Sequence, residues 1–206
     1  MADKQIMISI SREFGTSGHH IAAMIADDLG IKLYDRALLD HIAEEKGLDV
    51  KHLEKYDERP KLPIVSRRVR GHSNSMEDAL FHMQSEFLQK KADVGESFVV
   101  VGRCAETALK GREGLITVFI LGDKEVKLET VKEKFNISEK EALKKMKRHD
   151  IARKAYHNRH SERKWGDSRG YDLCVNDSKL GINKTVALIE TYIKQRMEGI
   201  DADDVL

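Results

Sequence analysis

The chain has 206 residues, of which 40% are hydrophobic and 34% are charged. This length and apolar content suit one medium-sized domain with a buried core. The 36 basic and 35 acidic residues nearly balance, so the chain as a whole is not a polycation, and affinity for phosphates has to come from local clusters of charge.

The cysteine content and the apolar runs point to a cytoplasmic protein. Only Cys104 and Cys174 are present, which argues against a disulfide framework and favours a reducing compartment. The N-terminal apolar run is too short for a signal peptide. No stretch approaches the ~20 apolar residues that span a bilayer, so we expect no membrane partner.

Short apolar runs alternate with helical patterns along the chain. We expect strands at residues 6–10, 32–35, 98–101, 115–121 and 173–175. We expect helices at residues 18–29, 36–46, 75–92, 125–135, 138–157 and 184–197. The runs at 98–101 and 115–121 are continuous enough for strands that are buried on both faces.

This alternation predicts an α/β fold with a parallel sheet of about five strands. Ser138 followed by Glu141 forms a capping-box pattern that marks a helix start. The segment 47–74 differs from the rest because it is polar and carries both prolines and several arginines. We interpret it as part of a lobe or flap beside the sheet.

The stretch "SREFGTSGHHIA" joins the first strand to the first helix through two glycines. Gly15 and Gly18 would let the backbone turn tightly and present its N–H groups to an anion at the helix N-terminus. Set against G-x-x-x-x-G-K-[ST], Glu13 replaces the first glycine, His19 the lysine, and His20 the hydroxyl residue. Two interpretations stay open, a phosphate-binding loop and a tight turn without a ligand.

Other residues of this stretch can replace the missing lysine. Arg12 lies within the loop in this interpretation and suits bidentate phosphate contacts. His19 would be a weaker, pH-sensitive substitute. Thr16 and Ser17 offer hydroxyl groups, and Ser17 or Ser11 would help to hold Mg²⁺, an ion that keeps several of its waters.

A second concentration of charge lies between residues 147 and 173. Three interpretations of this segment are open. It is a mobile lid whose arginines close over phosphoryl groups, a solvated helix, or a nucleic-acid-binding helix. Interleaved acidic residues and the balanced overall charge argue against nucleic acid. The arginines in question include Arg148, Arg153, Arg159 and Arg163.

Two histidines of the same segment have a spacing that zinc sites on helices use. They are His157 and His160. In the sequence, no carboxylate or cysteine completes a ligand set with them, so we expect no zinc site here.

Several motifs occur in a fixed order: "ISISREFGTSGHHIA", "YDRALL", "VVVGRCAETAL", "RHDIARKAYH" and "KWGDSRGYDLCVNDSKLGINKTVALI". Together they resemble the cytidylate kinase-like family, a branch of the nucleoside monophosphate kinases. The resemblance implies a three-layer P-loop kinase-like fold in a single domain over residues 1–206. It also implies an acceptor-binding lobe at 47–95 and an arginine-rich lid at 148–170.

The resemblance also implies roles for individual residues. Residues 15–20 would form the donor-phosphate loop, and Asp35 and Arg36 would meet the acceptor. Arg103 follows a buried strand, at the edge where sheet ligands bind, and would hold the acceptor phosphate. Arg159 and Arg163 are further acceptor-binding candidates. The expected catalytic residues are Arg12, His19, Arg103, Arg148, Asp150 and Arg153.

The expected reaction is transfer of the γ-phosphoryl group of ATP, with Mg²⁺, to CMP or dCMP. Alternatives are a kinase for another small phosphorylated metabolite and a non-catalytic nucleotide-binding or regulatory protein. We expect small-molecule nucleotides as partners, no nucleic acid, and a monomer or homodimer.

Overall fold

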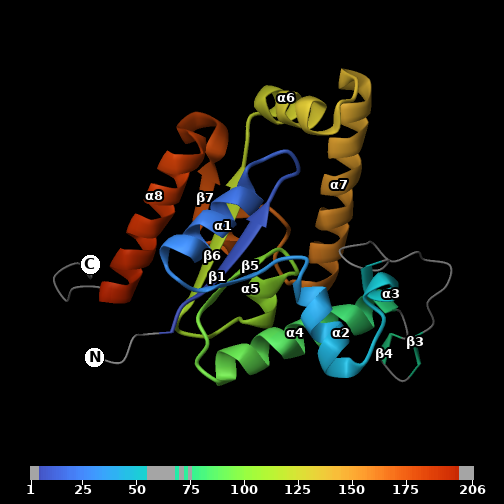
Figure 1. Ribbon diagram of the computed structural model, residues 1–206, viewed down its shortest axis with the longest axis vertical. Helices are drawn as coiled ribbons and strands as arrows, with labels where there is room; N and C mark the ends of the chain where they lie inside the picture. The colour runs from blue at the N-terminus through green and yellow to red at the C-terminus, as the bar shows by residue number, and fades with distance from the viewer. Residues whose placement is uncertain (1–4, 55–67, 70–71, 74–75, 200–206) are drawn as a thin grey trace.

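The structure, a computed structural model, describes residues 5–54, 68–69, 72–73 and 76–199 (Figure 1). Its centre is a five-stranded sheet with the order β2-β5-β1-β6-β7, in which all neighbours are parallel. These strands are β1 (Met7–Arg12), β2 (Lys32–Tyr34), β5 (Phe98–Val101), β6 (Leu115–Leu121) and β7 (Leu173–Asn176). A separate antiparallel pair consists of β3 (Arg68–Val69) and β4 (His72–Ser73).

Helices connect the strands and flank the sheet. They are α1 (Gly18–Asp28), α2 (Leu38–Lys46), α3 (Val50–Glu54), α4 (Met76–Asp93), α5 (Ala105–Ala108), α6 (Lys124–Phe135), α7 (Glu139–His160), the 3-10 turn η1 (Ser168–Gly170) and α8 (Asp177–Glu198). The predicted capping box starts α7, because Ser138 Oγ accepts from Glu141 N at 3.4 Å and Glu141 Oε2 accepts from Ser138 N at 3.0 Å. None of the helices in the described ranges is long and apolar enough to cross a membrane.

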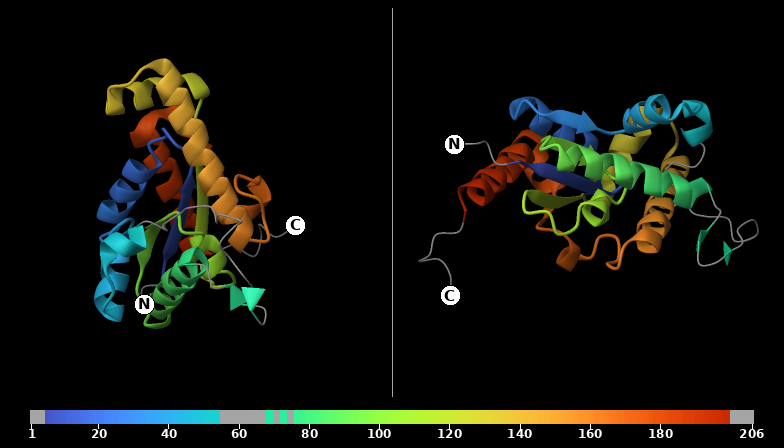
Figure 2. Two further views of the ribbon diagram at one scale, coloured as in Figure 1. Left: turned by 90° about the vertical axis from the view of Figure 1, so that its right-hand side faces the viewer. Right: turned by 90° about the horizontal axis from the view of Figure 1, so that it is seen from below.

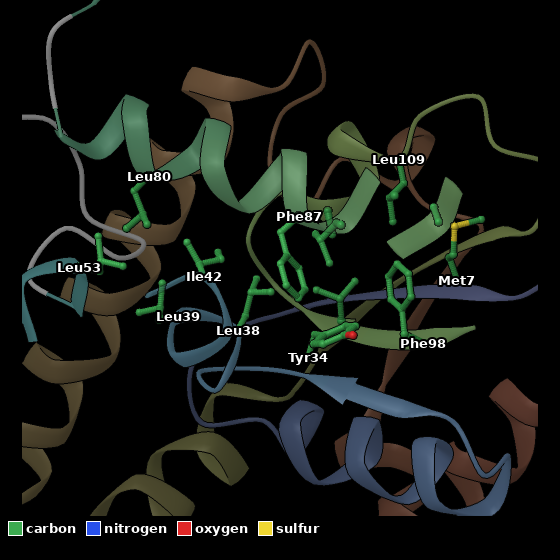
Figure 3. Packing of buried hydrophobic residues seen from close by; sticks show 14 of the residues in the cluster. Met7, Tyr34, Leu38, Leu39, Ile42, Leu53, Leu80, Phe87, Phe98 and Leu109 are labelled. Carbon is green, nitrogen blue, oxygen red and sulfur yellow. The ribbon is translucent and has the colours of Figure 1, made fainter. Parts of the chain in front are cut away.

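Two apolar layers cover the two faces of the sheet. The first packs α1 and α8 on alternate residues of β1, β5 and β6, including Ile8, Ile10, Val99 and Val118. The second joins the other face to α2, α4 and α5, and within it the Tyr34 ring contacts the rings of Phe87 and Phe98 (Figure 3). Two views at right angles show helices on both sides of the sheet (Figure 2). Burial on both faces explains why β5 and β6 are continuously apolar in sequence.

Parallel strands place their carboxyl ends at one edge of the sheet, where ligands of α/β folds bind. The segments that leave this edge are the loop after β1, Asp35 after β2, Arg103 beyond β5, Asp123 beyond β6 and Asp177 after β7. The α6–α7 pair begins here and frames one side of the molecule (Figure 1). The fold thus gathers charged residues from distant parts of the sequence.

Some predicted boundaries are wrong for identifiable reasons. Arg12 belongs to β1 and not to the loop, because its pairing with Ile120 extends the β1–β6 ladder. The last helix starts at Asp177, seven residues earlier than predicted, and contains a non-helical Gly181 with φ 72° and ψ 171°. That glycine interrupts the apolar period from which the helix was predicted.

The predicted lobe at residues 47–95 has two parts. Residues 55–67, with both prolines, lie outside the described residues. Its second part contains α4, whose Leu80, Phe87 and Leu88 belong to the second of the two apolar layers described above. The assignment of 47–95 to acceptor binding stays a prediction.

Candidate functional site

The loop of residues 13–17 connects β1 to α1 and packs tightly against α6. Gly15 has φ +92°, and a Cβ atom there would lie 3.0 Å from both Lys127 O and Val131 Cγ2. A Cβ atom on Gly18 would lie 2.7 Å from Arg12 Cβ. Glycine is therefore needed at both positions because neighbouring chain comes close. At Gly15 that neighbour is α6.

Two aspartates accept hydrogen bonds from backbone amides of the loop. Asp150 Oδ1, from α7, accepts from Phe14 N at 2.7 Å. Asp177 Oδ2, from the start of α8, accepts from Ser17 N at 2.6 Å. Burial raises the pKa of Asp150, and the Phe14 amide opposes that rise. Asp150 thus ties α7 to the loop.

Glu13 binds a buried lysine from α6. Its carboxylate accepts from Lys127 Nζ at 2.5 Å and from Gly122 N at 3.2 Å. Lys127 is only 8% exposed, which is rare for a lysine unless it is paired. The residue that replaces the first glycine of a P-loop therefore anchors a cation beside the loop. Sequence reasoning missed Lys127, since nothing distinguishes it within a charged helix.

Helix α7 also contacts the loop through Phe14 and the end of β1. The rings of Phe14 and His149 are stacked, with centroids 4.2 Å apart and an interplanar angle of 4°. Arg153 donates from an Nη atom to Arg12 O at 3.1 Å, and its guanidinium lies 5.7 Å from the Phe14 ring centroid. The first part of the predicted lid, residues 148–160, is thus a helix docked on the loop.

Positive charge gathers around His149. Burial first, and then the charges of Arg153, Arg148, Lys145 and Arg36, lower the pKa of His149 to about 4. These cations come from α7 and from the segment after β2, yet all act on one ring beside the loop. Such a local field attracts an anion although the chain is nearly neutral.

Replacing His149 with phenylalanine should reduce the loss of unfolding free energy that occurs at acid pH. The folded-state pKa of about 4 lies below the ordinary value of 6.5. The contribution of neutral His149 to the free energy of unfolding is therefore fully present above pH 6.5 and is lost as pH falls toward 4. Allowing for partial exposure, we expect the native chain to lose about 2 kcal/mol that the variant keeps. Urea unfolding of both proteins at about pH 7 and pH 4.5 measures this difference.

His160 provides an internal control for that comparison. Burial also lowers its pKa to about 4, but it is present in both proteins and cancels. Equal losses in the two proteins would contradict the assignment to His149.

Asp35 contacts both His19, at the start of α1, and Arg103, beyond β5. Its Oδ2 lies 2.7 Å from His19 Nε2, and its Oδ1 accepts from Ala37 N at 3.0 Å. Burial raises the pKa of Asp35, but the hydrogen bonds from His19 and Ala37 outweigh it and hold the pKa below the ordinary value. The residue at the lysine position of the loop is therefore paired with a predicted acceptor ligand.

Arg103 is buried at the carboxyl end of β5. It is 3% exposed, and an Nη atom donates to Asp35 O at 3.5 Å. Its φ is 62° and that of Cys104 is 55°. Two consecutive non-glycine residues with positive φ store strain that the surrounding structure has to offset, a feature that concentrates at functional sites.

Other predicted site residues make contacts of their own. Arg159 forms a bidentate pair with Asp78 of α4, at 2.5 and 2.6 Å. Thr16 Oγ1 donates to Glu13 O at 2.9 Å and accepts from Gly18 N at 3.4 Å. Further predicted residues are the buried Ser11, the exposed His20 and Arg148, and the exposed Arg163 after α7.

The structure therefore unites most, but not all, of the predicted residues. The loop contacts Asp150 and Arg153, His19 contacts Asp35, and Arg103 contacts Asp35. Arg159 instead pairs with α4. Asp177 was missed, although its place directly after a strand was a usable signal.

The comparisons with known proteins agree with this architecture. A family model described as "Cytidylate kinase-like family" matches residues 7–179. A crystal structure of an uncharacterized protein from Eubacterium ventriosum is 37% identical, with a TM-score of 0.74 and coverage of 93% of this chain and 99% of that chain. The search of curated proteins finds no match.

Shikimate kinases share the fold at low identity. The enzyme from Bacteroides thetaiotaomicron is 12% identical, with a TM-score of 0.55 over 92% of this chain and 99% of that chain. The enzyme from Aquifex aeolicus is 16% identical, with a TM-score of 0.51 over 95% and 100%. These likenesses concern the fold alone and confirm the predicted P-loop kinase-like architecture with its parallel sheet. Because the family model spans most of the chain, the protein belongs to the cytidylate kinase-like family.

Proposed function

We propose that the protein transfers the γ-phosphoryl group of ATP to a nucleoside monophosphate, CMP or dCMP. Membership of the family supports kinase-type phosphoryl transfer. The observation that carries the proposal is the cluster of Arg36, Arg148 and Arg153 beside the loop, whose field contributes to the low pKa of His149. Phosphoryl transfer needs chiefly positioning and neutralisation of charge, which such a cluster supplies.

In this proposal the two sides of the sheet edge hold the two substrates. The N-terminus of α1 and the loop would face the donor phosphates, with Arg153 and Arg148 from α7. Arg103, Arg36 and Asp35 would orient the acceptor. Because Asp35 contacts both His19 and Arg103, it would fix the relative position of donor and acceptor groups, and misplacement by ~1 Å is costly to such reactions.

The residues at this edge suit Mg²⁺, which prefers oxygen ligands and retains waters. Asp177 is 6% exposed, and its carboxylate lies at the loop, where it accepts a hydrogen bond from the Ser17 amide. Asp177 and the hydroxyl of Ser17 would hold the ion, which supplies neutralisation of the donor phosphates. A carboxylate so near the phosphates would otherwise repel them.

A coupled ADP-release assay with ATP, Mg²⁺ and a panel of nucleoside monophosphates tests the proposal. We expect turnover with CMP or dCMP well above that with AMP, GMP or UMP. Turnover only with another small phosphorylated metabolite would support kinase activity and contradict CMP or dCMP as the acceptor. Absence of turnover with every acceptor would contradict the proposed kinase activity.

A second function, nucleotide binding without catalysis, is favoured by one observation. Two loop amides, those of Phe14 and Ser17, already donate to carboxylates. If ATP can neither displace these carboxylates nor share the amides with them, the loop would bind nucleotide weakly and would not align the phosphates for in-line transfer. Calorimetry would then show heat of ATP binding, while the coupled assay would show no ADP.

A further inference from the structure

A cluster of potential metal ligands lies where α5 meets α7, next to the proposed site. Cys104, Glu106 and His157 each offer one ligand atom, and these atoms all lie within 4.8 Å of one another. Cys104 directly follows Arg103, and His157 is one turn beyond Arg153. In the sequence His157 lies 53 and 51 positions after Cys104 and Glu106, so the fold is needed to show that they are neighbours.

The polar atoms of this cluster are buried and incompletely satisfied. The side chains of His157 and Glu106 are 5% and 8% exposed, and Nε2 of the first lies 2.7 Å from Oε1 of the second. This contact is close but is not an aligned hydrogen bond, so Glu106 Oε1, like His157 Nδ1, makes no hydrogen bond among the described residues. A buried carboxylate oxygen that lies against an imidazole nitrogen without an aligned hydrogen bond is rare, and an ion held between the two atoms would explain it.

We propose that Cys104 Sγ, the Glu106 carboxylate and the His157 imidazole bind a zinc ion. A thiolate and a carboxylate together carry two negative charges, which balance Zn²⁺ beside a neutral imidazole. The thiolate favours zinc over the hard ions Mg²⁺ and Ca²⁺. Ligand atoms around tetrahedral zinc lie ~3.3–3.8 Å apart at bond lengths of ~2.0–2.3 Å, so binding needs only a small opening of the Glu106–His157 contact.

Neighbouring groups support the ligands. Ser9 Oγ donates to Glu106 Oε2 at 3.1 Å and so orients the carboxylate. The hydroxyl of Tyr171 lies 3.5 Å from His157 Nε2, where it would contact a water in the fourth coordination position. Such outer contacts typically strengthen metal binding 10–100-fold.

The ion would join the turn that carries Arg103 to the helix that carries Arg153. This role is independent of the acceptor identity and of catalysis, because it concerns how two elements are held together. Metal content therefore tests it directly.

The experiment uses the full chain, produced with zinc, dialysed without strong chelators and analysed by mass spectrometry for metals. We expect about one zinc per chain. Cys104→Ser should lose at least four-fifths of it, whereas the matched variant Cys174→Ser, at the exposed cysteine, should keep it. Substitution with Co²⁺ adds a spectroscopic readout, since a thiolate-to-cobalt charge-transfer band should appear in the native chain and vanish in Cys104→Ser.

Glu106→Gln guards against a folding artefact, because it keeps the shape and the hydrogen bond from Ser9. It should weaken zinc binding at least tenfold while circular dichroism stays native. A native chain without zinc and without the cobalt band would overturn the proposal. So would zinc retained in Cys104→Ser, or zinc lost equally in Cys174→Ser.

Discussion

Replacement of Arg103 by alanine should lower kcat/KM about 10²–10³-fold in the phosphoryl-transfer assay. Arg103 is 3% exposed at the carboxyl end of β5, and its guanidinium lies against Asp35 O. Under the proposed function Arg103 is a preorganised donor to the acceptor phosphate, and removal of one such donor typically has an effect of this size. Alanine retains a Cβ atom, so the strain of the positive φ stays the same in both proteins. Initial rates with varied acceptor concentration measure the loss.

Two variants sharpen that result. Arg103→Lys keeps the charge but not the fork-shaped donor, so it should recover only part of the rate. Arg112→Ala removes a partly exposed arginine that pairs with Asp93 at 2.6 Å, and it should leave the rate unchanged. An Arg103→Ala protein with native kinetics would remove Arg103 from the site.

Replacement of Gly15 by alanine should impair both stability and nucleotide binding. The substitution places a side chain at φ +92°, with its Cβ atom 3.0 Å from the Lys127 carbonyl oxygen and from Val131. A backbone oxygen cannot rotate away, so the loop has to separate from α6. We expect a loss of about 2–4 kcal/mol in unfolding free energy, from the strained φ and the contact together. The KM for ATP should rise at least tenfold.

Gly111→Ala is the matched control for that experiment. Gly111 has φ +85°, and nothing lies within 4 Å of its virtual Cβ atom. It pays the same conformational cost, about 1 kcal/mol, without a collision, and its KM for ATP should be native. If the two variants behave alike, the packing of α6 on the loop has no bearing on nucleotide binding.

The strands and helices could be predicted well because their signals are local. The ranges 98–101 and 115–121 coincide with β5 and β6, since burial on both faces leaves a continuous apolar run. The capping box at Ser138 placed the start of α7. The end of β1 was less predictable, because Arg12 is polar and joins the ladder only through its backbone pairing with β6.

The sequence indicated that arginines gather in one region, but it did not indicate which groups the acidic residues of the candidate site contact. Asp150 lies one turn before Lys154 in sequence, a spacing that favours a local ion pair on a helix. Its actual partner, the Phe14 amide, is 136 positions away. Lys127 likewise reaches Glu13 across 114 positions. Pairings of this kind depend on where whole helices dock, which local pattern does not encode.

The hydrogen bond between Ser17 N and Asp177 Oδ2 has a consequence for the order of assembly. Its two residues are 160 positions apart, so it is among the most non-local contacts of the chain, and such contacts form late and slow folding. A growing polypeptide emerges with its N-terminus first. A nascent chain that stops short of β7 would contain the entire glycine loop and still lack one of the acceptors that hold its backbone. Completion of the loop therefore coincides with the docking of the last strand–helix unit.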